Sequence, residues 1–186
     1  RRDGGATSSN VRGIWLGGQT PSNSDVIDFV TMASAGNAAD FGNLSAARAF
    51  NPGTSNKIRG VVGGGNDPAV NTIEYVNFAS KGDAIDFGDL TSARYGKCAC
   101  SDSHGGLIAN EVPRPSVTYM PGSGRGLFSK GADNVSAITM ININTLGNAT
   151  TFGDAVAVNG HNSSSTGGSA TRGFLLGSGA TGDTDK

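Results

Sequence analysis

The chain has 186 residues, of which 30 are glycine and only 16% are charged, and its formal net charge is −1. Such a balance lacks the clustered Lys and Arg of a nucleic-acid-binding surface, and no apolar run approaches the ~18 residues of a membrane-spanning helix. Gly, Ser, Thr and Asn outweigh the usual helix-forming residues, which favours short strands joined by glycine turns. We therefore predict an all-β fold.

The first predicted strand, over residues 13–18, belongs to a cassette that recurs along the chain. Arg12-Gly13, an apolar run and a Gly doublet reappear from Arg59, a shift of 47 residues. Two further copies start at Arg125 and Arg172, which are again 47 residues apart. A repeat of this length that holds several short strands is typical of stacked β architectures.

A second cassette, over residues 27–48, aligns without a gap on residues 73–94, with 12 identities in 22 positions. Its first strand carries apolar side chains on both alternating faces, which indicates burial on both sides, as in a propeller blade stacked between two neighbours. A turn follows at Gly36-Asn37. Each copy is predicted to hold four strands, which in the first copy lie at 13–18, 26–32, 40–42 and 46–48.

The repeats are unequal in length, and a third copy of the second cassette begins at Ile138. The expected segments are the end of a preceding blade (1–11), three blades (12–58, 59–103 and 125–171), a truncated blade (104–124) and the first strand of a further blade (172–186). Because both ends stop within a blade, we expect either an excerpt of a longer repeat protein or blades that partner chains complete.

These residues resemble a known repeat. A strand that ends in Gly-Gly, then Ile-Glu-Tyr-Val at 73–76, then Asp-Phe-Gly-Asp-Leu-Thr-Ser-Ala-Arg at 86–94 resembles a kelch repeat. The sequence of these cassettes is similar to that of repeat proteins of marine and cyanobacterial tailed phages, which are described as virion structural or tail-fibre-like. The resemblance implies a kelch-like β-propeller. The third copy departs from it at Ser129-Lys130, Ala155 and Asn159, so we expect that blade to pack differently.

Motifs that spell catalytic signatures are better explained by the repeat. Asp40-Phe41-Gly42 and Asp86-Phe87-Gly88 match the metal-binding tripeptide of kinases, but the other kinase motifs are missing from the sequence. The glycine run 63–65 is followed by no predicted helix that would complete a phosphate loop. His104 and His161 lie in predicted loops of different repeats, and no serine elbow accompanies them. We expect no catalytic site, no metal and no cofactor, and we expect no enzyme activity.

The recurring arginines are the most distinctive charged positions, and they allow two interpretations. They are Arg12, Arg59, Arg125 and Arg172 in the first cassette and Arg48 and Arg94 in the second. The favoured interpretation pairs them with Asp28, Asp40 or Asp86 to hold adjacent strands. The alternative is a ring of guanidinium groups that line a channel and bind an anion.

Cys98 and Cys100 stand two residues apart, too close for an unstrained disulfide, and only His104 is near enough in sequence to suggest metal binding. We expect two reduced thiols. Four Asn-x-Ser/Thr sequons, at Asn43, Asn134, Asn148 and Asn162, arise readily by composition in such a chain and would matter only in a glycosylating secretory pathway.

Three functions follow as hypotheses. The first is a non-enzymatic phage virion protein of the tail-fibre or capsid-decoration type, which is oligomeric with other virion subunits and binds cell-surface polysaccharide. The second is a self-assembling extracellular filament or surface-layer subunit. The third is a kelch-type adaptor for a protein partner. The first two place the chain on a virion or outside the cell, and none requires nucleic acid or a membrane span. The sequence does not identify the ligand-binding residues.

Overall fold

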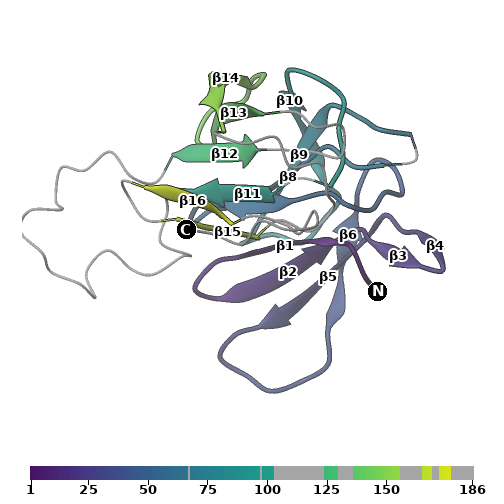
Figure 1. The fold of residues 1–186 in the computed structure, drawn as a ribbon. Helices are drawn as coiled ribbons and strands as arrows, with labels where there is room; N and C mark the ends of the chain where they lie inside the picture. The colour runs from purple at the N-terminus through teal and green to yellow at the C-terminus, as the bar shows by residue number, and fades with distance from the viewer. Residues whose placement is uncertain are drawn as a thin grey trace, which may run out of the picture.

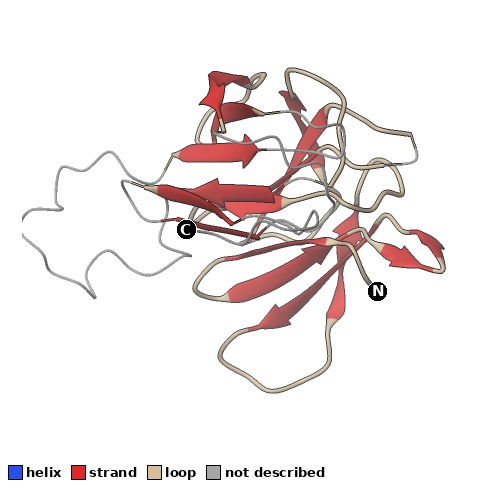
Figure 2. Cartoon of the chain, viewed as in Figure 1, coloured by secondary structure: helices blue, strands red, loops and turns tan. Residues whose placement is uncertain are grey.

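The computed structural model describes residues 1–66, 68–96, 98–102, 124–129, 136–155, 165–168 and 172–176. Over these residues it contains strands and no helix, so the all-β prediction is confirmed (Figure 2). In particular, none of the described segments provides a long apolar helix that would cross a membrane.

The described strands form three four-stranded antiparallel sheets and two short hairpins (Figure 1). Sheet 1 holds β1 (Gly5–Ser8), β2 (Arg12–Leu16), β5 (Val26–Thr31) and β6 (Ala39–Asn43). Sheet 2 holds β7 (Gly53–Ser55), β8 (Arg59–Gly63), β9 (Thr72–Asn77) and β10 (Ile85–Asp89). Sheet 3 holds β11 (Cys98–Ser101), β12 (Arg125–Ser129), β13 (Ala137–Asn142) and β14 (Thr150–Asp154). The hairpins are β3–β4 (Gln19–Thr20, Ser22–Asn23) and β15–β16 (Ser165–Gly168, Gly173–Leu176).

Each four-stranded sheet is a meander, in which the strands pair in the order in which they follow one another along the chain. The last pair of strands in each sheet carries a register shift at an equivalent place, next to Gly42, Gly88 and Gly153. These glycines have φ values of 155°, 143° and 159°, which side-chain-bearing residues rarely adopt. The glycine of each Asp-Phe-Gly or Thr-Phe-Gly tripeptide is therefore a bulge residue, as its repetition suggests.

One predicted strand is wrong. Residues 46–48 form no strand, and each sheet is instead completed by a strand that precedes the Arg-Gly pair, namely β1, β7 or β11. The backbone at Arg48 crosses the ends of the sheet 1 strands, because its amide donates to the Ser24 carbonyl and its carbonyl accepts from Gly18. Those hydrogen bonds replace a strand ladder at this segment.

The predicted truncated blade at 104–124 lies outside the described residues except for residue 124. The strands that flank it in sequence, β11 and β12, pair directly with each other in sheet 3. The described sheets do not close into a ring, so the propeller is still a prediction.

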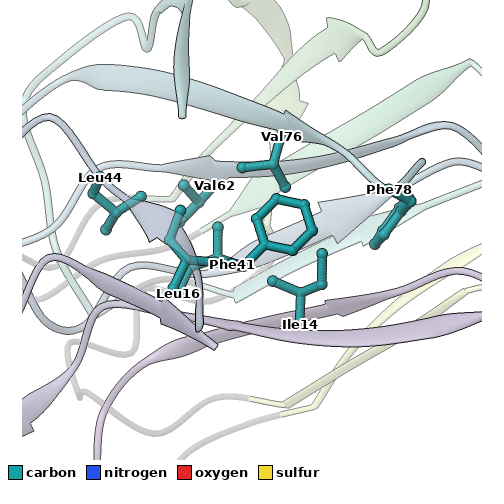
Figure 3. Packing of buried hydrophobic residues seen from close by; sticks show 8 residues of the cluster. Ile14, Leu16, Phe41, Leu44, Val62, Val76 and Phe78 are labelled. Atoms are coloured by element: carbon teal, nitrogen blue, oxygen red, sulfur yellow. The ribbon is translucent and has the colours of Figure 1, made fainter. Parts of the chain in front are cut away.

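The three sheets are joined by two apolar layers. Between sheets 1 and 2 lie buried side chains of both sheets, among them Ile14, Leu16 and Phe41 of sheet 1 and Val76 and Phe78 from β9 and its end (Figure 3). An equivalent layer between sheets 2 and 3 holds Val61, Ile73, Phe87, Leu90, Phe128, Ile141, Ile143 and Ala149. Each fully buried aliphatic or aromatic side chain contributes about 1.5–3 kcal/mol relative to exposure.

Sheet 2 is buried on both faces, as the sequence predicts for its copy of the repeat. Its strand β8 sends Val62 into the layer with sheet 1 and Val61 into the layer with sheet 3. In sheet 1, where the pattern at 26–32 predicts the same, the prediction is wrong for one face, because Met32 is 60% exposed. The first strands of the successive sheets also contact one another in the order β1, β7, β11 and β15. The sheets are thus stacked face to face, with their first strands gathered along one line.

Candidate functional site

The best-buried charges in the described structure join sheet 1 to sheet 2. Arg48, on the loop after β6, donates from Nη2 to Oε2 of Glu74 on β9, and only 4% and 2% of the two side chains are exposed. The Ser45 amide donates to Glu74 Oε1 over 3.0 Å. Burial lowers the pKa of Arg48, and the adjacent Glu74 carboxylate opposes that shift. Removal of either partner would leave a buried charge with no counter-charge.

The same position recurs on the other sheets with different chemistry. On sheet 1, Asp28 stands where Glu74 stands on sheet 2, and Arg1 pairs with it while also donating to the Val26 carbonyl over 2.7 Å. On sheet 3 the position holds Thr139. Arg94, the counterpart of Arg48, donates there to the Ala137 carbonyl over 3.3 Å and to nearby hydroxyl groups.

Sequence analysis therefore predicted the structural role of these arginines but not their partners. The carboxylates it proposed, Asp40 and Asp86, form no ion pair among the described residues, and Asp28 pairs with Arg1. Glu74 was missed, although its alignment with Asp28 in the repeated cassette, acidic in both copies, was a signal that could have identified it.

The first-cassette arginines also link neighbouring sheets. Arg12 on sheet 1 donates to the Phe78 carbonyl of sheet 2, and its guanidinium lies 5.1 Å from the Phe29 ring centroid. Arg59 on sheet 2 donates over 3.0 Å to the Ile143 carbonyl, which follows β13 of sheet 3 as Phe78 follows β9 of sheet 2. These guanidinium groups contact carbonyl oxygens and aromatic rings, so the interpretation as a ring of anion ligands is not favoured.

A third link connects the outer strands. The Gly82 and Ala84 amides in the turn before β10 donate to the Phe41 and Asn43 carbonyls of β6, over 2.9 and 2.8 Å. One sheet further along, the Gly147 and Ala149 amides bond Phe87 and Asp89 over 2.9 and 2.7 Å. The Phe41 and Phe87 carbonyl groups of the Asp-Phe-Gly segments thus anchor the next sheet.

The remaining predicted residues do not gather into a site. Cys98 and Cys100 are free thiols, as expected, and burial together with Cys98 raises the pKa of Cys100. His104 and His161 lie outside the described residues, as do the sequons at Asn134 and Asn162. Within the described ranges no three His, Cys, Asp or Glu side chains cluster to hold a metal.

The candidate binding site is a groove of about 360 Å³ on the free face of sheet 1, which sequence analysis did not predict. Trp15 of β2 and Asp28 and Val30 of β5 line it, together with the segment before β1. The full lining is Arg1, Arg2, Asp3, Gly4, Trp15, Gly17, Asp28, Val30 and Ala38. Trp15 was the available signal, because it is the only tryptophan in the chain.

The groove lies at a face whose counterparts elsewhere are covered. Trp15 is 45% exposed, whereas Val62 and Phe128 at the same repeat position are 0% and 1% exposed. At the opposite end of the stack, Phe152 of sheet 3 is 51% exposed, whereas its counterpart Phe87 is 2% exposed. Both end sheets therefore present side chains that the internal junctions bury.

No protein-family model matches the sequence, and no curated protein matches it.

Proposed function

We propose that this chain is a non-enzymatic, kelch-like β-propeller repeat protein of a virion, of the tail-fibre or capsid-decoration type, whose rigid surface binds cell-surface polysaccharide. The kelch and phage assignments rest on the sequence resemblance, and the stacked four-stranded sheets agree with it. Further subunits of the same assembly would be its protein partners.

One observation carries the non-enzymatic, scaffold-like part of the proposal. The distinctive repeated side chains, Arg12, Arg48 and Arg59 among them, contact the neighbouring sheet. Residues used in this way stiffen the frame, and a rigid frame lowers the entropy lost when its surface binds a ligand.

The outer hairpin tips support polysaccharide as the ligand class. The tips at 33–37, 79–83 and 144–148 are rich in Gly, Ser, Asn and Asp and are exposed on successive sheets. The hydrogen bonds from Gly82 and Gly147 to the preceding sheet hold these tips in a row. A row of equivalent polar tips on a fixed frame suits a polymer whose hydroxyl groups repeat.

Glycan-array binding by the isolated chain tests the ligand class directly. We expect selective signals on neutral host-derived polysaccharides, and no signal above background across such an array would contradict the proposal. Electron microscopy of the source virus tests the location, with labelled density on tails or capsids as the expected result.

A second candidate function is a self-assembling extracellular filament, and the exposed end faces favour it. Phe152 and Trp15 lie at the two ends of the stack, and the internal junctions bury their counterparts. Isolated filaments of purified protein in electron micrographs would support this candidate over the first.

A further inference from the structure

The groove on sheet 1 combines an exposed aromatic ring with paired charges. Two guanidinium groups, on Arg1 and Arg2, and two carboxylates, on Asp3 and Asp28, line it together with Trp15. The formal charges of these four groups cancel, so the groove does not attract a strongly charged ligand. Hydrogen-bond donors and acceptors nevertheless line the groove together with the indole, so it offers both an apolar ring and polar groups to a ligand.

The groove shares one feature with the internal junctions and differs from them in another. Arg1 pairs with Asp28, as Arg48 pairs with Glu74, so the groove carries the ion pair of a junction. Arg2 stands at the position of Ala49, which is fully buried beside the next sheet. The Arg2 side chain is 77% exposed and its Nε lies 3.6 Å from Asp3 Oδ2. An exposed charged side chain thus stands at the rim where the junction has a buried apolar one.

We propose that this groove is a binding subsite for one neutral sugar unit of the polysaccharide, with the apolar C–H face of the sugar ring on Trp15. The Arg and Asp side chains of the rim exchange hydrogen bonds with the hydroxyl groups, since the carboxylates accept and the guanidinium groups donate. An uncharged polyol satisfies both sets without disturbing the two ion pairs. The inference rests on the proposed function, because it assigns a place to the polysaccharide contact.

Tryptophan fluorescence provides a direct test, because Trp15 is the only tryptophan of the chain. The intact 186-residue chain is titrated with neutral malto-, cello- and manno-oligosaccharides and, for comparison, with sulfated and sialylated ones. We expect a saturable emission change with at least one neutral series and none with the charged series. Emission that depends on protein concentration without sugar, with matching dimers in sedimentation, would show that a second copy occupies the face and would overturn the inference.

Variants then locate the contact by calorimetry on the best neutral oligosaccharide. Trp15→Ala should weaken binding about ten-fold or more, and Trp15→Phe should retain part of the affinity. Met32→Ala is the matched control, since Met32 is an exposed apolar residue just after β5 that does not line the groove, and its affinity should be unchanged. Circular dichroism and thermal melts confirm that each variant folds.

The outcomes separate the inference from the proposed function. Array binding that Trp15→Ala leaves unchanged would refute the subsite while the polysaccharide function stands. Absence of binding to every glycan by the wild-type chain would refute both.

Discussion

The buried ion pair between Arg48 and Glu74 joins sheets 1 and 2, so the stability of the fold should be sensitive to an isosteric substitution of Glu74. Glu74→Gln preserves the shape of the side chain and leaves the Arg48 guanidinium buried without a counter-charge. The Ser45 amide, which donates to Glu74 Oε1, keeps an acceptor in the variant. The new NH2 group then faces Arg48 Nη2, so the change removes both the counter-charge and the acceptor of Arg48.

The expected loss follows from the burial of both partners, which are 4% and 2% exposed. Removing one member of a buried pair costs about 3–5 kcal/mol, because the remaining charge is desolvated and unpaired. For a chain of this size, each kcal/mol lowers the melting temperature by roughly 2–4 °C, so the loss corresponds to about 6–20 °C. Urea denaturation and scanning calorimetry measure it.

The repeat offers a matched control at the equivalent position. Asp28 pairs with Arg1 at a far more exposed place, 34% and 20%, so Asp28→Asn should cost no more than about 1 kcal/mol. The double variant Arg48→Met/Glu74→Leu, which removes both charges, should recover most of the stability that Glu74→Gln loses. Equal losses for Glu74→Gln and Asp28→Asn would refute the reasoning.

Three further predictions concern the other repeat positions. Thr139→Glu places a carboxylate opposite Arg94, as Glu74 stands opposite Arg48. The substitution should therefore change the unfolding free energy more favourably, by about 1–3 kcal/mol, in the wild-type chain than in an Arg94→Met variant. A double-mutant cycle measures this difference. Gly88→Ala should destabilise the fold by at least ~1–3 kcal/mol more than Gly153→Ala in urea melts, because its Cβ would lie 2.6 Å from the Gly147 carbonyl oxygen while nothing lies within 4 Å of the other. Burial raises the pKa of Cys100, so the folded state holds the thiol proton more tightly than the unfolded chain does. The unfolding free energy should therefore be unaffected by this thiol below about pH 8.5 and should fall as the pH rises above it. A Cys100→Ala variant should show a flatter dependence of the unfolding free energy on pH between about pH 8 and pH 10.

The sequence predicts the sheets well where the pattern is set by local chemistry. Apolar residues on both alternating faces of β9 require burial on both sides, and the structure buries Ile73 and Val76 in different layers. The glycine after each Phe of the second cassette is a bulge residue for the same local reason, a backbone conformation that a Cβ disfavours.

Assignments that depend on contacts between repeats were harder to predict. Residues 46–48 read as a strand, but their backbone groups bond the ends of sheet 1 instead, a geometry that alternation does not encode. The partner of Arg48 is Glu74, 26 residues away on the next sheet, and none of the three aspartates that the sequence suggested. The groove was missed because Trp15 resembles its buried counterparts in sequence and differs only in what covers it.

Native-state hydrogen exchange tests the central claim, that the repeated positions serve to join one sheet to the next. The Gly82, Ala84, Gly147 and Ala149 amides donate across the two junctions, whereas the Gly36 amide, in the equivalent turn of sheet 1, donates no such hydrogen bond to any described residue. We predict that the four junction amides exchange only through large-scale opening, while the Gly36 amide exchanges rapidly. Junction amides that exchange as fast as Gly36 would contradict the account.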